Sequence, residues 1–252
     1  MQAILVLAYG VVSYVVFFAT FLYAIWFVYT LDQPSANGPL LQSILIDAVL
    51  LGIFAMQHSI MARQWFKRAW TKIVPRAAER STYVLAASLA LLALIRFWQP
   101  VVTPVWTVEA PAGRAVLEVL FWAGWGLVLV GTFLIDHFDL FGLRQAWTFF
   151  QGRAYKPLEF RTPGPYNVVR HPIYLGFLLA FWSAPTMTAG HLFFAIMTTG
   201  YILVAIQFEE HDLVKFHGSA YQAYQRSVSM IIPWRRKAEK ERAMASGQSA
   251  GR

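Results

Sequence analysis

Two short polar blocks interrupt an otherwise apolar sequence and carry groups that could bind a charged small molecule. The first is RTPGPYNVVRHPIYLG, residues 161–176, in which Arg170 and His171 stand directly before a hydrophobic run. Pro172 suits the first turn of a helix, so we expect a helix to begin near His171. Its free N–H groups, together with Arg170, could bind a carboxylate or a phosphate. The alternative is an ordinary anchor at the membrane interface, with Tyr166 and Tyr174 in an aromatic belt.

The second block is QFEEHDLVKFHGSAYQAYQRSVSMIIPW, residues 207–234. Glu209 and Glu210 fall where the last long apolar run ends. A helical hairpin between the blocks would bring these carboxylates to Arg170 and His171. Such a pairing could form a pocket for a ligand that carries both charges, or it could be an internal ion pair that closes the hairpin. The residues alone leave both interpretations open.

The elements that position these blocks follow from composition. Hydrophobic residues make up 58% of the 252 residues, charged residues 13%, and the mean hydropathy is +0.48. Soluble domains rarely have such values, and apolar runs of about 18 or more residues are long enough to cross a bilayer as helices. The sequence therefore predicts an all-α, polytopic transmembrane bundle.

Five to six membrane helices are expected, because the fifth apolar run is short and Pro185 separates it from the sixth. We expect this last pair to form a C-terminal hairpin that builds the binding site. We further predict N-terminal membrane helices in residues 1–115, a functional core in 116–234 and a disordered tail in 235–252. The predicted runs are 4–29, 41–62, 82–99, 116–137, 172–184 and 188–208.

Positive charge is distributed very unevenly along the chain. All but two, Arg96 and Arg114, of the 21 Lys and Arg residues fall in segments that six crossings place on one side. The positive-inside rule makes that side cytoplasmic, and with it both termini and the site; we expect a bacterial inner membrane. The net charge of +8 is spread over these segments, which favours anionic lipid over nucleic acid as the partner. No obligatory protein partner is indicated.

The absence of cysteine limits the possible chemistry. With no Cys, disulfides, thiolate nucleophiles and Cys-based zinc sites are excluded. A zinc site from His58, His137 and His171 with nearby acids is conceivable, but no pair has a recognised ligand spacing. We therefore expect no metal.

The two blocks also carry a family resemblance. GPYNVVRHPIYLG, followed by EEHDLVKFHGSAYQAYQRSVSMIIP, resembles the isoprenylcysteine carboxyl methyltransferase and phospholipid methyltransferase group over residues 116–234. The resemblance implies S-adenosylmethionine as cofactor, with Arg170 suited to its carboxylate and Glu209 or Glu210 to its amine or ribose. The cofactor-binding residues implied are Gly164, Pro165, Tyr166, Arg170, His171, Tyr174, Leu175, Gly176, Glu209 and Glu210.

The N-terminal half points to one branch of this group. YGVVSYVVFFATFLYAIWFV, MQHSIMARQWFK and IDHFDLFGLRQAWTFF resemble the methanethiol S-methyltransferases, which make dimethyl sulfide from a volatile thiol. A thiol acceptor reacts as its thiolate, so a general base would be useful. The candidate catalytic bases are His58, Asp136, His137 and Asp139.

Each candidate base also has a structural alternative. His58 could tie its helix to a neighbour by a hydrogen bond, and the two aspartates could pair with Arg144 or Arg153. Other functions stay open as well. The chain could methylate an isoprenylated cysteine or a phospholipid, act as a sterol-reductase-like enzyme with a nicotinamide cofactor, or be a membrane protein without enzymatic activity.

Overall fold

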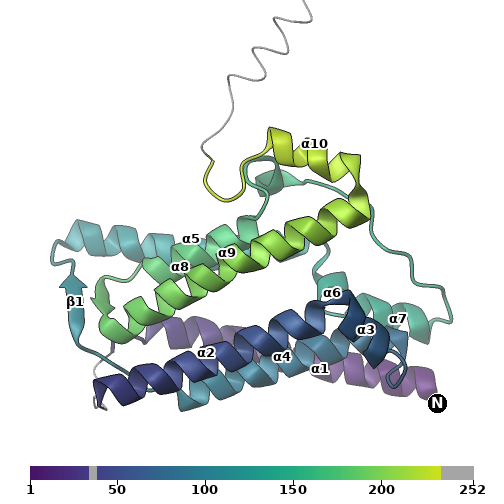
Figure 1. Ribbon diagram of the computed structural model, residues 1–252, viewed down its shortest axis with the longest axis horizontal. Helices are drawn as coiled ribbons and strands as arrows, with labels where there is room; N and C mark the ends of the chain where they lie inside the picture. Colours follow the sequence, from purple (N-terminus) through teal and green to yellow (C-terminus); the bar gives the residue numbers. More distant parts are fainter. Residues whose placement is uncertain (34–38, 234–252) are drawn as a thin grey trace, which may run out of the picture.

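The computed structural model describes residues 1–33 and 39–233, and five of its helices are long and apolar enough to cross a membrane. They lie roughly along one direction (Figure 1). The predicted all-α polytopic bundle is confirmed, and the chain is an integral membrane protein. The five helices are α1 (Gln2–Tyr29), α2 (Leu40–Ala62), α4 (Arg76–Phe97), α5 (Pro111–Leu134) and α9 (Ala189–His217).

Shorter elements complete the described part of the chain. The helices among them are α3 (Gln64–Trp70), α6 (His137–Leu140), α7 (Leu143–Phe150), the 3₁₀ turn η1 (Gly164–Asn167), α8 (Pro172–Trp182) and α10 (Ser219–Ser227). Two short strands, β1 (Pro104–Thr107) and β2 (Thr186–Thr188), pair antiparallel. The tail predicted for 235–252 lies outside the described residues.

The short helix α8 does not span a bilayer by itself. Its 11 residues give a length of roughly 16 Å, about half of a hydrocarbon core. The chain continues through 183–188, and β2 in that segment pairs with β1 between α4 and α5. The backbone N–H of Ala189 also donates to the carbonyl of Thr103. The run predicted at 172–184 is therefore a short helix followed by extended chain, and a crossing by this segment stays a prediction.

The sheet marks one end of the bundle and the polar blocks lie at the other. β1 and the turn between α8 and α9 lie at the end opposite α3, α6, α7 and α10 in Figure 1. The first residue of α1 lies at that second end too. Both candidate blocks thus share an end with the loops that carry most of the positive charge.

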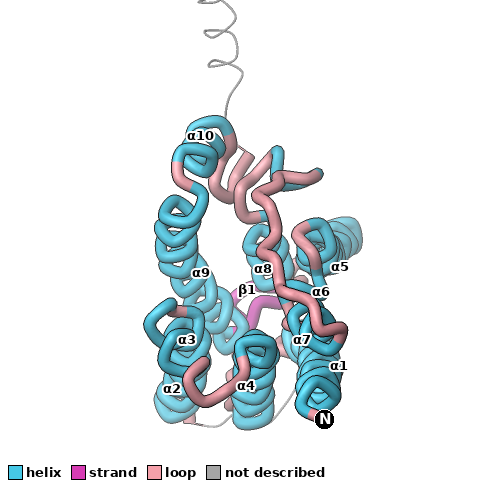
Figure 2. Tube along the Cα trace, turned by 90° about the vertical axis from the view of Figure 1, so that its right-hand side faces the viewer, coloured by secondary structure: helices cyan, strands magenta, loops and turns pink. Residues whose placement is uncertain are grey.

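Helix α8 lies between α5 and α9 (Figure 2) and packs on α5 without intervening side chains at one point. A Cβ added to Gly176 would lie 2.6 Å from the carbonyl oxygen of Gly124, and one added to Gly124 would lie 2.6 Å from that of Gly176. Only glycine at both positions permits this approach. Around it, Phe27, Trp98, Phe181 and Phe194 form an edge-to-face aromatic core near the sheet end.

Several helix boundaries differ from the sequence-based expectation, and the largest differences are in α4 and α9. α4 begins at Arg76, although its apolar run begins at 82, and α9 continues to His217, beyond the expected end at 208. Hydropathy marks only the lipid-facing part of a helix, whereas backbone hydrogen bonding continues into polar residues. Glu209 and Glu210 therefore lie within a continuous helix. The division at 115/116 stays a prediction; α1 packs against α7 and α2 against α9 across it.

Candidate active site

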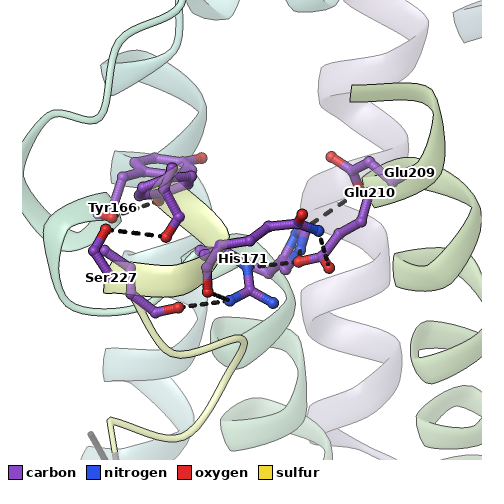
Figure 3. Close-up of polar contacts among 9 residues, drawn as sticks. Tyr166, His171, Glu209, Glu210 and Ser227 are labelled. Atoms are coloured by element: carbon purple, nitrogen blue, oxygen red, sulfur yellow. Dashed lines mark hydrogen bonds and ion pairs between the residues drawn. The ribbon is translucent and has the colours of Figure 1, made fainter. Parts of the chain in front are cut away.

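A nearly buried ion pair joins the two polar blocks. The Arg170 Nε donates to Glu210 Oε1 at 2.6 Å, and the side chains keep only 11% and 12% of their surface exposed. His171, at the start of α8, places its Nε2 3.0 Å from the same oxygen. Glu210 lies on α9, so the contact closes the α8–α9 hairpin (Figure 3). The predicted approach of these residues is confirmed, in the form of an internal ion pair.

Helix α10 and the segment that follows it supply the other partners of this pair. Arg170 Nη1 donates to the carbonyls of Gln225 and Val228, and the Gln225 side chain donates to Glu210 Oε2 at 2.9 Å. The backbone N–H groups of Arg170 and His171 donate to the carbonyls of Ser229 and Met230. These backbone contacts hold the start of α8 beside the chain after α10.

The 3₁₀ turn is fixed by two tyrosines. Tyr224 on α10 donates its hydroxyl to the carbonyl of Tyr166, and Tyr166 donates its own to the carbonyl of Gly131 on α5. Burial raises the pKa of Tyr224 to about 12 and raises that of Tyr166 well above its usual range. Both hydroxyls therefore stay protonated and act as donors. Gly164 has φ +54°, a conformation that favours glycine.

Of the two adjacent glutamates, Glu209 is the one whose carboxylate is accessible to a ligand. Its side chain keeps 44% of its surface exposed, and Tyr174 donates to its Oε2 at 2.8 Å. His171 Nδ1 lies 4.0 Å from the same oxygen. Since a carboxylate has about four acceptor sites, Glu209 can still accept hydrogen bonds from a ligand. No described side chain caps the first turn of α8. Because Pro172 has no N–H and that of His171 donates to Met230, the N–H groups of Ile173 and Tyr174 are the backbone donors left there within the described residues.

The remaining predicted cofactor residues make structural contacts with the surrounding chain. Pro165 accepts two backbone hydrogen bonds within the turn, from Val168 and Val169. Leu175 is partly buried against the apolar core, and Gly176 faces α5. Their role in binding a cofactor stays a prediction.

A second polar group lies between α2, α4 and α9. His58 Nε2 lies 2.8 Å from the Tyr83 hydroxyl, and Ser59 is 3.2 Å from the hydroxyl of Tyr201. Tyr83 interacts electrostatically with Glu209, and Tyr174 interacts with both Tyr83 and Tyr201. His58 thus lies on the side of the bundle that faces Glu209, and the hydrogen bond that the sequence suggested for it does link two helices.

The other three candidate bases are occupied elsewhere. His137 is buried beside α1 and α5, with Nδ1 2.8 Å from Thr132 and Nε2 2.9 Å from Tyr14. Burial lowers its pKa, so the imidazole stays neutral. Asp136, at φ +79°, caps α6 by accepting from the N–H of Asp139.

Asp139 forms the ion pair that the sequence suggested. It binds Arg144 at 2.9 Å and accepts from Tyr155 at 3.0 Å. Burial and the Asp139 charge raise the pKa of Tyr155 to about 12. These contacts give Asp139 a structural part in holding the segment after α7. A catalytic role for Asp136, His137 or Asp139 stays an untested prediction, which this geometry does not favour.

The described residues, 1–33 and 39–233, contain no group of three or more His, Asp or Glu placed to hold a metal ion. They do place the partly exposed carboxylate of Glu209 against Tyr174 in the first turn of α8. Glu209 suits an ammonium or ribose hydroxyls, and the uncapped start of α8 suits a carboxylate. Arg170 is less free than the sequence suggested, because Glu210 and two carbonyls occupy its guanidinium.

Sequence reasoning missed Tyr83, Tyr201, Tyr224 and Gln225. Tyr224 and Gln225 belong to the repeat AYQAYQ, whose spacing of three places successive tyrosines on one helix face. That repeat was a usable signal. Tyr83 and Tyr201 lie inside apolar runs where tyrosine is common, so nothing in the sequence distinguished them.

Comparison with known proteins extends this description. The chain matches the family model described as "Protein of unknown function (DUF1295)" over residues 70–228, more than half of its length. The chain belongs to the DUF1295 family. The match runs from the end of α3 into the segment after α10. In this DUF1295 chain it covers all of the first polar block, most of the second block and Tyr83 on α4, whereas His58 lies before it. No solved structure gave a significant match.

Similar curated proteins carry names that agree with the family resemblance. This DUF1295 protein is 52% identical to a methanethiol S-methyltransferase of Mycobacterium tuberculosis over 93% of its length and 98% of the relative. It is 49% identical to one of Crocosphaera subtropica, over 91% and 92%. Nurim of Xenopus laevis is 31% identical over 66% of this chain and 61% of that protein. The resemblance to the methanethiol S-methyltransferases is thereby confirmed.

Proposed function

We propose that this protein is an integral membrane methyltransferase that transfers a methyl group from S-adenosylmethionine to methanethiol and so forms dimethyl sulfide. The activity follows from the names of relatives that are about half identical over nearly the whole chain. The observation that carries the site is the half-exposed carboxylate of Glu209. It lies between the closed Arg170–Glu210 pair and the tyrosines that face His58.

In this proposal Glu209 binds the cofactor, and the neighbouring polar side chains hold the helices around it in place. Glu209, oriented by Tyr174, would hold the amine or the ribose of the cofactor, while the N–H groups at the start of α8 would hold its carboxylate. When bound, S-adenosylmethionine supplies a methyl group on a positively charged sulfur. Arg170, Glu210 and Gln225 are positioning residues that fix α8, α9 and the chain after α10 relative to one another. The apolar helices around them exclude water from the acceptor.

The direct test is methyl transfer by the purified protein. We would incubate it with methyl-labelled S-adenosylmethionine and, in parallel, methanethiol, longer thiols, an isoprenylated cysteine or phosphatidylethanolamine, and identify the labelled product. Labelled dimethyl sulfide supports the proposal, whereas label only in the lipid or the prenyl cysteine contradicts it. A titration with reduced nicotinamide cofactor tests the reductase alternative.

Glu209→Gln should separate cofactor binding from folding. Loss of the charge removes a charged hydrogen bond worth about 1.5–3 kcal/mol, so we expect about 10- to 100-fold weaker cofactor binding by calorimetry. Glu159 is the matched control, because it is a carboxylate in a largely exposed ion pair with Arg161. Glu159→Gln should bind the cofactor as the parent does. Equal affinity in Glu209→Gln would remove this residue from the site.

The proposed orientation places both polar blocks on the cytoplasmic side of a bacterial inner membrane. Reporter fusions after Trp70 and Gln151 should therefore report the cytoplasm, and one at Thr107 in β1 should report the opposite side. Helix α3, which ends at Trp70, and α7, which ends just before Gln151, lie at the site end of the bundle, and β1, which ends at Thr107, lies at the other end (Figure 1). A cytoplasmic signal from the fusion at Thr107 would contradict the orientation.

A further inference from the structure

Besides the cofactor block, the bundle holds a polar group whose members come from three different helices. His58 lies on α2, Tyr83 on α4 and Tyr201 on α9, and hydrogen bonds join α2 to both of the other helices. Polar side chains at membrane depth are costly unless they are paired or serve a site. The His58 side chain is partly buried, and its ring stacks on Phe54 one turn earlier on α2.

The hydrogen bonds of His58 leave its ring able to accept a proton. Within the described residues its only hydrogen-bond partner is the Tyr83 hydroxyl, which lies 2.8 Å from Nε2 and 3.2 Å from Nδ1. One neutral imidazole nitrogen is a proton acceptor. His137 differs, since a separate hydroxyl occupies each of its ring nitrogens. Of the chain's candidate bases, His58 alone combines a free accepting capacity with a place facing Glu209.

We propose that the thiol substrate binds between α2, α4 and α9, where Tyr83 contacts its S–H group and relays the proton to His58. This inference rests on the proposed function and specifies its acceptor site. The ligand class is a small, neutral alkyl thiol, because the Tyr83 hydroxyl and the His58 imidazole offer its S–H group a proton acceptor and no fixed charge.

The step balances with the groups named. The thiol sulfur forms the new bond to the methyl carbon while the methyl–sulfonium bond breaks, and that electron pair stays on the departing sulfur. The S–H proton passes to the Tyr83 oxygen as the Tyr83 proton passes to His58 Nε2, which leaves tyrosine neutral and histidine charged. The imidazolium then releases its proton to water.

The surroundings of the pair are also charged on several sides, which bears on any pH dependence. The titratable and charged groups that face it are Arg63 after α2, Arg80 on α4, Tyr174 on α8, and Tyr201 and Glu209 on α9. Arg80 lies over the Tyr83 ring at 5.3 Å and donates to the carbonyl of Leu140. No carboxylate contacts His58 directly among the described residues.

The test compares His58→Gln and Tyr83→Phe, alone and combined, with His211→Gln as the control. His211 is an exposed histidine on α9. At about pH 7 we expect kcat/KM for methanethiol to fall about 100-fold in His58→Gln and about tenfold in Tyr83→Phe. The double variant should be no worse than His58→Gln, because the two residues act as one unit. His211→Gln should match the parent.

Two readouts separate catalysis from structure. Between about pH 6 and about pH 9, the deficit of His58→Gln should shrink about tenfold per pH unit, because solution then supplies thiolate. Cofactor affinity by calorimetry should stay within about twofold of the parent. A parental rate in His58→Gln, or a deficit that does not change with pH, overturns the inference. If His58→Gln does not fold, the pH dependence of Tyr83→Phe decides in the same way.

Failure here is distinguishable from failure of the proposed function. A parent protein that binds no S-adenosylmethionine and forms no dimethyl sulfide refutes the function itself. An active parent with an unaffected His58→Gln refutes only the thiol site.

Discussion

Glu210→Ala is expected to destabilise the protein by about 3–5 kcal/mol and to lower methyl transfer more than about a hundredfold. The substitution leaves the Arg170 guanidinium nearly buried without its carboxylate, and it removes the acceptor of His171 and Gln225. An unpaired charge in such a place is far costlier than the pair is favourable. Thermal unfolding in detergent and initial rates would measure the two effects.

Two comparisons make this result specific. Glu159→Ala breaks an ion pair whose side chains are 79% and 85% exposed, and it should change neither stability nor rate. Replacing Arg170 and Glu210 together by Met should recover much of the stability but not the activity, because no charge is then left unpaired while the positioning is lost. A stable and active Glu210→Ala protein would show that the pair does not hold the site.

Gly176→Val is expected to abolish activity and to prevent α8 from docking. Even a single Cβ at this position would lie 2.6 Å from the Gly124 carbonyl and 2.9 Å from the Val128 backbone nitrogen, and backbone atoms cannot rotate away. The helix would have to move off α5, and Arg170 and His171 would move with it. Gly176→Ala should cost about 1–3 kcal/mol, as moderate overpacking does.

The matched controls are glycines in the same kind of helix. Gly126 on α5 and Gly200 on α9 have nothing within 4 Å of an added Cβ. Gly126→Ala and Gly200→Ala should therefore be neutral or slightly stabilising, since alanine favours helix. Folding is measured by size-exclusion profile and activity by labelled dimethyl sulfide. Activity in Gly176→Val equal to that of these controls would contradict the proposed close packing.

The architecture was largely predictable because lipid imposes a simple rule on sequence. Runs of apolar residues must be helices, and the short fifth run before Pro185 predicted a helix that is too short to cross by itself, as α8 is. What hydropathy could not give was the polar extension of α9 to His217, or the strand pairing of 104–107 with 186–188. Both depend on hydrogen bonds between segments that have no apolar pattern.

The site was predictable in its residues and less so in their partners. The sequence predicted that Arg170 and His171 lie near Glu210. It also suggested Arg170 as a donor to the ligand, whereas its guanidinium donates to Glu210 and to two backbone carbonyls. The carbonyls that occupy it are backbone atoms, and any residue type could supply them. Likewise, nothing in the sequence favoured one of the four candidate bases over the others. The contacts of His137 and Asp139 in the structure distinguish these two residues from His58.

The contact between α8 and the chain after α10 also sets an order of assembly. Residues 228–230 supply carbonyls to Arg170 and His171, yet they are synthesised after every long helix. All five long helices can therefore insert into the bilayer while Arg170 still lacks these carbonyl partners. A translation product that stops shortly after α9 would be inserted and inert. Maturation of the enzyme is thus a late event, separate in time from its entry into the membrane.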